Sequence, residues 1–203
     1  MGQAAKRLRA FKARIGRFKA LRRARVRTDR LLRTGGISAM TYGGRVNGVS
    51  DSLLLKQRRA AAATTCDRGC GGDLDITLMI ADDMTSGAAD PAFEAHVGGL
   101  YMWAVAVWGC WAPVHVLDRL ITATKRRVRT AKNVWAKVFG PTAAVIVTAR
   151  RIRWRIISAA EFVDDEGTHL DLRKDSPAYV RGMVTRSVVR WRWRTVEHRL
   201  PAL

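Results

Sequence analysis

The segment 95–117 constrains the fold most, because its twenty-three residues carry no formal charge and their exposure to water is unfavourable. A protein core or a membrane has to cover such a run. Glycines and a proline lower its hydropathy, and tryptophans lie in its middle rather than at both ends, so a buried core helix is favoured. Trp103, Val107 and Trp111 recur every fourth residue and are expected to form the core seam, and Pro113 to start or kink the next helix.

Most of the rest of the chain is strongly basic. Lys and Arg number 37 against 17 Asp and Glu, which gives a formal net charge of +20, while 48% of the residues are hydrophobic and can build a core. Residues 1–34 contain thirteen bases and one acid, whereas residues 51–94 contain eight acids and four bases. Further basic clusters occupy Lys125–Arg129, Arg150–Arg155 and Arg186–Arg194. A folded domain with this excess repels itself, so a polyanion with a phosphate backbone is the expected partner.

The N-terminal bases lie on an expected amphipathic helix. Apolar residues from Leu8 to Val26 recur every three to five positions between Lys and Arg, and Gly35-Gly36 ends the pattern. A basic helix laid on nucleic acid is favoured over a packed surface helix with a solvated face. The residues predicted to bind nucleic acid are Arg14, Arg17, Arg22, Arg23, Arg126, Arg127, Arg190, Trp191, Arg192 and Arg194. For Trp191, stacking on a base and burial in the core are both open.

Local patterns predict a mainly α fold with a small α+β C-terminal part. The expected elements are a helix over 52–65, a loop over 66–90 whose apolar run 74–80 is a strand or a buried turn, a helix from Thr142 to about Trp154, a β-hairpin at 156–173 and a last helix opened by Ser176-Pro177. The chain then divides into a basic helical segment 1–65, an acidic Gly-rich loop 66–90, an apolar Trp-rich helical segment 91–139 and a basic α-β-β-α subdomain 140–203.

A series of short motifs runs through most of the chain. Leu31–Arg59 contains Tyr42-Gly43, then Val46-x-Gly48-Val49-Ser50 and an apolar-basic helix. This order resembles the thumb-type region just after the catalytic core in reverse transcriptases of non-LTR retroelements. The second half is similar to the next region along the chain in a subgroup of retroelement-like polyproteins, at Asp90-Pro91, Trp103 to Trp108, Gly140-Pro141-Thr142-Ala143-Ala144, Ile152-Arg153-Trp154, Phe162-Val163, Leu170-Asp171-Leu172 and Val189-Arg190-Trp191-Arg192-Trp193. The resemblance implies a connecting region rather than an active site.

Two acidic motifs bear on catalysis. Ile80-Ala81-Asp82-Asp83 looks like the signature that supplies metal-binding carboxylates in reverse transcriptases. No apolar strand comes after it, however, and the chain before it is too short to hold the rest of a polymerase, so a solvated acidic loop is favoured and no catalytic residue is assigned. The consecutive acids Asp164-Asp165-Glu166 before Gly167 are typical of a hairpin turn whose acids point into solvent, not of the separated carboxylates of an RNase H site.

The three cysteines argue against a disulfide scaffold and favour a reducing compartment, nuclear or cytoplasmic. Cys66-x-x-x-Cys70 raises the question of zinc, but a structural site needs four ligands. The remaining candidates, Cys110, His96 and His115, are scattered over an apolar segment. Two ordinary thiols are therefore favoured, and neither a metal nor a cofactor is expected.

These observations favour a non-catalytic fragment of a retroelement protein that binds RNA or an RNA/DNA hybrid through phosphates. The resemblance adds the polymerase part of the same polyprotein as a second partner. Two alternatives stay open. One is a membrane-anchored structural or interaction protein with a span near 95–117, which carbonate-resistant membrane association would favour, and the other is a retroelement relic without a function.

Overall fold

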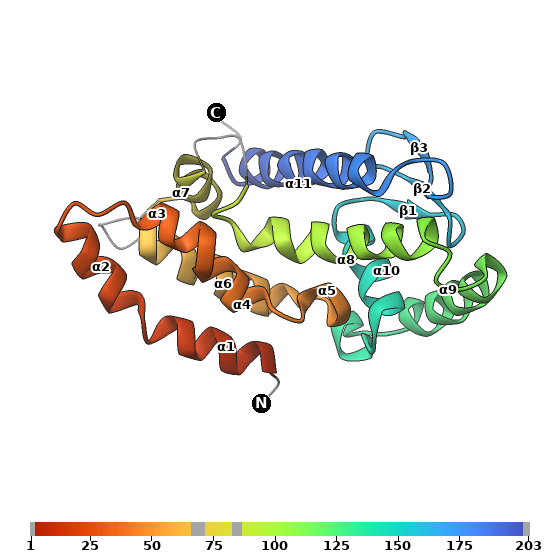
Figure 1. The fold of residues 1–203 in the computed structure, drawn as a ribbon, viewed down its shortest axis with the longest axis horizontal. Coiled ribbons are helices and arrows are strands. Elements are labelled where there is room, and N and C mark those ends of the chain that lie inside the picture. Colours follow the sequence, from red (N-terminus) through yellow and green to blue (C-terminus); the bar gives the residue numbers. More distant parts are fainter. Residues whose placement is uncertain (1–2, 66–71, 83–86, 201–203) are drawn as a thin grey trace. The chain divides into compact units, whose positions relative to one another are not determined.

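The computed structural model describes residues 3–65, 72–82 and 87–200 (Figure 1). Helices make up most of it, and a three-stranded antiparallel sheet precedes the last helix. The prediction of a mainly α fold with a small α+β C-terminal part is confirmed. The chain forms two compact units, each built from separate stretches of sequence: unit 1 from Met1–Tyr42, Val49–Glu94 and Val189–Leu203, and unit 2 from Gly43–Gly48 and Ala95–Val188.

Unit 1 is helical over most of its described residues. Its elements are α1 (Gln3–Lys12), α2 (Ile15–Arg23), α3 (Thr28–Leu31), the π-helical turn η1 (Leu32–Gly36), α4 (Ile37–Thr41), α6 (Asp51–Thr65), α7 (Leu74–Ala81), the start of α8 (Pro91–Trp108) and the end of α11 (Pro177–Arg199). The helix predicted over 52–65 is confirmed as α6. The prediction of one amphipathic helix from Leu8 to Val26 is wrong, since this segment forms two helices. α1 buries Leu8 and Phe11, whereas α2 buries none of its residues.

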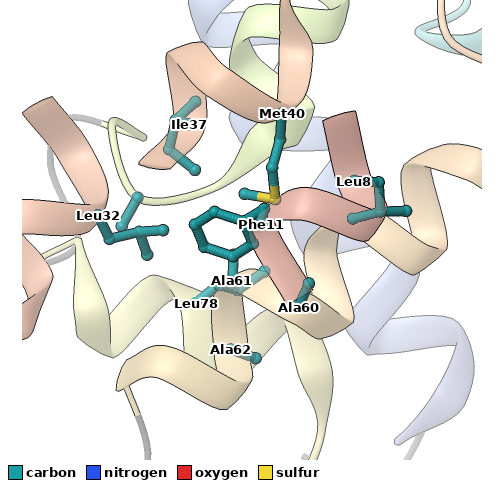
Figure 2. Close-up of a cluster of buried hydrophobic side chains, with 10 residues drawn as sticks. Leu8, Phe11, Leu32, Ile37, Met40, Ala60, Ala61, Ala62 and Leu78 are labelled. Carbon is teal, nitrogen blue, oxygen red and sulfur yellow. The ribbon is translucent and has the colours of Figure 1, made fainter. Parts of the chain in front are cut away.

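The hydrophobic core of unit 1 gathers around Phe11, which Figure 2 shows between Met40 and the alanines of α6. The other buried side chains of this core are Leu8, Leu32, Ile37, Leu78 and Ala89. Burial of each large side chain contributes about 1.5–3 kcal/mol. Gly36 belongs to the same packing, since a Cβ there would lie 2.9 Å from ring atom Cε2 of Phe11. The path of the chain through η1 therefore depends on a residue without a side chain.

The apolar run 74–80 is a helix, α7, and the prediction of a strand or a buried turn is wrong. Asp73 explains the difference, because its carboxylate accepts hydrogen bonds from the backbone N–H groups of Asp75 (2.8 Å) and Ile76 (3.1 Å). This is a side-chain cap on the first turn of a helix. Leu78 and Met79 of α7 are buried, so the short helix is held by packing as well as by its cap.

Unit 2 contains the sheet. Its elements are α5 (Gly44–Asn47), most of α8, α9 (Val114–Arg129), η2 (Val134–Lys137), α10 (Pro141–Arg151), β1 (Arg155–Ile156), β2 (Glu161–Val163), β3 (His169–Asp171) and the first part of α11. All residues of α10 from Ala143 to Ala149 are buried, which makes it the central helix of this unit. α10 ends at Arg151, before the Trp154 that the sequence pattern predicts as its end. Trp154 instead donates a hydrogen bond from its indole N–H to the Ser187 hydroxyl at 2.8 Å.

The predicted hairpin is present and gains a third strand. β2 and β3 pair antiparallel, with Phe162 opposite Leu170, and Gly167 in their turn has a φ of 90° that favours glycine. β1 pairs with the other edge of β2. The final helix, predicted from Ser176-Pro177, is confirmed as α11.

The uncharged run 95–117 is not one helix. α8 ends at Trp108, the chain turns through Cys110 with a φ of 52°, and α9 begins at Val114 after Pro113. The core seam is confirmed for Trp103 and Val107, which are buried, but it is wrong for Trp111, which is 65% exposed because the helix has already ended. Among the described residues, no helix combines the length and the apolar character that a membrane span requires.

Candidate functional site

The exposed bases of α2 are the first candidate phosphate contacts, on unit 1. Arg14 lies just before the helix, and Arg17 and Arg23 lie within it; all three are exposed. Within residues 3–65, 72–82 and 87–200 none of these three side chains has an ion-pair partner. A cation without a partner loses no existing ion pair when it binds a phosphate. These arginines therefore meet the basic requirement for phosphate binding.

Arg22, the fourth predicted contact in this segment, has a structural partner. Its guanidinium donates a hydrogen bond to the backbone carbonyl of Thr64 at 3.0 Å, and the hydroxyl of Thr28 donates to the same oxygen at 2.9 Å. The last carbonyls of a helix have no partner within the helix. Arg22 thus joins α2 to the end of α6, and Arg23 is the better candidate for a phosphate contact.

The last turn of α9 forms a second candidate surface, on unit 2. Arg126 and Arg127 are exposed there, while Ile121 and Val128 of the same helix are buried. Neither arginine has an ion-pair partner in the described part of the chain. Cations at a helix C-terminus also interact favourably with the helix dipole, so their position alone does not require a ligand.

The predicted nucleic-acid contacts on α11 differ in how far they are buried. Arg190, Trp191 and Arg194 are half-buried, whereas Arg192 is 3% exposed. Arg192 lies within 3.4 Å of a carboxylate oxygen of both Asp82 and Asp90. Its guanidinium is enclosed in unit 1, so we remove Arg192 from the residues expected to contact phosphate. The even spacing of Arg and Trp gave no sign of this difference.

Trp191 also has a partner inside unit 1. The guanidinium of Arg58 lies over its indole ring, 5.4 Å from the ring centroid, which is a cation–π contact. Trp193, two residues later, is 43% exposed. Successive odd residues of a helix point in very different directions, so only one of the two tryptophans packs inward.

Arg58 is the centre of a buried ion cluster. Its Nε lies 2.9 and 3.1 Å from the two carboxylate oxygens of Asp90, and its Nη2 donates to Asp90 at 2.9 Å and to Asp75. Arg199 reaches the same cluster from the end of α11, where it pairs with Asp73 at 3.0 Å and with Asp75. The cluster therefore ties α6, α7, the start of α8 and the end of α11 together within unit 1.

The prediction that Ile80-Ala81-Asp82-Asp83 is a solvated acidic loop is wrong for Asp82, and the other described acids of 66–90 are also mostly buried, with the side chain of Asp73 12% exposed. Asp75 and Asp82 are 1% exposed and Asp90 is 0% exposed. A buried carboxylate needs a charged partner or hydrogen bonds, and Arg58, Arg192 and Arg199 supply the partners. Asp83, Cys66 and Cys70 lie outside the described residues.

Burial sets the electrostatics of the cluster. Burial raises the pKa of Asp82 to about 6, although the Ala89 N–H and Arg192 act in the opposite direction. Burial alone would lower the pKa of Arg58, but the charges and hydrogen bonds of Asp90 and Asp75 outweigh it and raise that pKa. The raised pKa means that Asp82 takes up a proton at a higher pH than an ordinary aspartate.

The buried acids of the cluster are engaged with arginines of the same unit. Each of the buried carboxylates Asp75, Asp82 and Asp90 lies against a guanidinium group of the same unit. Among the described residues, no group of three or more His, Cys, Asp or Glu side chains is placed to hold a metal ion.

The acids of the hairpin turn in unit 2 also have partners. A carboxylate oxygen of Asp164 accepts hydrogen bonds from the N–H groups of Glu166 (2.9 Å) and Thr168 (2.8 Å), and Asp165 accepts one from the Ser187 hydroxyl. The predicted turn is confirmed, but the prediction that all three acids point into solvent is wrong, because Asp164 is buried. A turn aspartate that binds its own backbone explains this burial.

No family model, no curated protein and no solved structure matches this chain. The resemblance to retroelement polyproteins therefore stays a prediction.

Proposed function

We propose that this protein binds RNA or an RNA/DNA hybrid through phosphate contacts and has no catalytic role of its own. The observation that carries the proposal is the set of exposed bases at α2, Arg14, Arg17 and Arg23, which have no ion-pair partner in the described part of the chain. The net charge of +20 supports it, since a polyanion compensates the repulsion within the protein.

The structure narrows the residues that the proposal needs. Arg192 is buried and Arg22 is bonded to α6, so the contacts on unit 1 are assigned to the three exposed arginines. Arg126 and Arg127 on α9 are assigned as further contacts on unit 2. Contacts of this kind recognise the backbone and carry no base information, so we expect little preference for sequence.

The salt dependence of binding tests the proposal. Each neutralised phosphate of a single strand contributes a slope of about −0.7 to log affinity against log salt concentration. The variant with Arg14→Gln, Arg17→Gln and Arg23→Gln should therefore have a slope flatter by about two units on single-stranded RNA. Fluorescence anisotropy with labelled RNAs of two unrelated sequences measures both the slope and the lack of sequence preference.

A matched control removes three other exposed charges, by Lys132→Gln, Lys137→Gln and Lys174→Gln on unit 2. It has the same net charge as the first variant. Its slope should differ from that of the unmodified protein by less than about 0.7, the contribution of one phosphate contact. Equal flattening in both variants would show that only net charge matters. An unchanged slope in the α2 variant would remove α2 as the binding surface.

A further inference from the structure

A solvent-open cavity of about 470 Å³ lies in unit 1, and its lining includes none of Arg14, Arg17 and Arg23. Helices α1 and α6, which are in contact, and the residues just before α6 supply its walls. It is lined by Ala5, Leu8, Arg9, Lys12, Ser50, Ser52, Leu53 and Lys56.

The spacing of the lining residues places them on one face of each helix. Residues 5, 8, 9 and 12 lie on one face of α1, and residues 52, 53 and 56 lie on one face of α6. Each helix therefore presents an apolar residue next to a base, with Leu8 buried and Leu53 half-buried. The cavity has an apolar floor and a basic rim.

The charges of the rim are not compensated. Arg9, Lys12 and Lys56 are exposed, and none of them has an ion-pair partner in the described part of the chain. No acid is among the lining residues. Three cations that share one cavity repel one another, and an anion bound between them removes that repulsion.

Two hydroxyl groups complete the polar lining. Ser50 accepts a hydrogen bond from the backbone N–H of Leu53 at 3.4 Å, and its oxygen lies 3.5 Å from that of Ser52. Both contacts are long, so the hydroxyls can turn towards a ligand oxygen. The first turn of α6 adds the positive end of a helix dipole, which the exposed Asp51 at its start offsets in part.

We infer that this cavity binds a phosphate monoester, the group found at the end of a nucleic-acid strand and in a free nucleotide. Three cations and two hydroxyls suit a doubly charged anion with three terminal oxygens. Cavities that bind small molecules measure roughly 300–1,000 Å³, and the apolar floor offers a surface for the nucleoside that carries the phosphate. The site uses none of the arginines on which the proposed function rests, so an experiment can refute either one without refuting the other.

Adenosine 5′-monophosphate is the direct probe, with the full chain and isothermal titration calorimetry. The variant with Lys12→Gln and Lys56→Gln should bind it at least about tenfold more weakly, because two charge-assisted contacts to the phosphate are lost. The matched control, Lys6→Gln with Lys19→Gln, removes two exposed lysines outside the lining and should bind within twofold of the unmodified protein. Inorganic phosphate should compete with the nucleotide.

Oligonucleotides distinguish the source of the phosphate. A 5′-phosphorylated strand that binds more tightly than its 5′-hydroxyl twin, with the advantage lost in the cavity variant alone, identifies a strand end. Nucleotide binding without that advantage identifies a free nucleotide, and either result supports the site. Absence of nucleotide binding, or equal loss in the cavity and control variants, overturns it. Circular dichroism checks folding, and Arg9→Gln is the second variant should the double variant unfold.

Discussion

Replacement of Arg58 by methionine removes the charge at the centre of the buried ion cluster and keeps most of the apolar stem. The unmodified side chain pairs with Asp90 and Asp75. After the change Asp90 keeps the Ala92 N–H at 2.9 Å and Arg192 at 3.4 Å, and Asp75 keeps Arg199. Two carboxylates then share fewer positive charges in a buried site, so the folded state loses stability.

The decrease in the free energy of unfolding depends on the burial of Arg58, Asp75 and Asp90. Removal of one member of a buried ion pair costs about 3–5 kcal/mol, because the remaining charge stays buried with less compensation. For a chain of about 200 residues each kcal/mol lowers the melting temperature by about 2–4 °C, so we expect a decrease of roughly 6–20 °C. Thermal unfolding monitored by circular dichroism at 222 nm measures it directly, since the chain is mainly helical.

Arg59 provides a matched control on the same helix. It is exposed and has no ion-pair partner in the described part of the chain, so Arg59→Met should change stability by less than about 0.5 kcal/mol. Addition of Asp90→Asn to Arg58→Met should restore part of the loss, because it removes the uncompensated charge. Equal melting temperatures for the two methionine variants would refute the view that the cluster holds unit 1 together.

Two further predictions concern Asp82 and Trp103. Burial raises the pKa of Asp82 from 3.8 to about 6, so its contribution to stability is full below pH 4 and is lost as the pH rises through 6. Asp82→Asn should therefore be more stable than the unmodified protein above pH 6, by up to about 3 kcal/mol, and equally stable near pH 4. Urea unfolding at both pH values measures the difference in free energy of unfolding. A gain in stability that is the same at both pH values would contradict the raised pKa. Trp103 donates its indole N–H to the Ala159 carbonyl at 2.9 Å inside unit 2, so Trp103→Phe should cost about 1–3 kcal/mol in urea unfolding. Trp111→Phe, at a site 65% exposed, should cost less than about 0.5 kcal/mol, and similar costs would show that the buried hydrogen bond contributes nothing.

Local backbone signals were sufficient to predict several elements of the fold. Ser176-Pro177 starts α11, Gly140-Pro141 starts α10, and Gly167 turns the hairpin. Proline fixes its own φ, Ser176 accepts a cap hydrogen bond from the Tyr179 N–H, and Gly140 and Gly167 adopt the positive φ that other residues avoid, so the information lies within a few residues of the element. α7 was missed although its cap, Asp73, is equally local, because its apolar residues show no helical period and the surrounding Gly and Asp suggest a loop.

The candidate surface was predicted in part for a similar reason. A segment with thirteen bases and one acid has to expose most of its charges, and the structure places Arg14, Arg17 and Arg23 at the surface. The sequence could not show that Arg22 would dock on Thr64, because that choice depends on how α2 lies against α6. The cavity between α1 and α6 was likewise unpredicted, since its two walls are far apart along the chain.

The sequence by itself determined the basic character of this protein, its mainly helical fold and the positions of several helix starts, because charge, apolar spacing and capping are properties of short segments. Only the tertiary structure decided which charges are buried. Arg58 meets Asp90 across 32 residues of sequence, and Arg199 meets Asp75 across 124. Acids and bases that look alike in sequence are buried or solvated according to whether packing brings an opposite charge to them. No local sequence pattern shows which distant residues come together in this way.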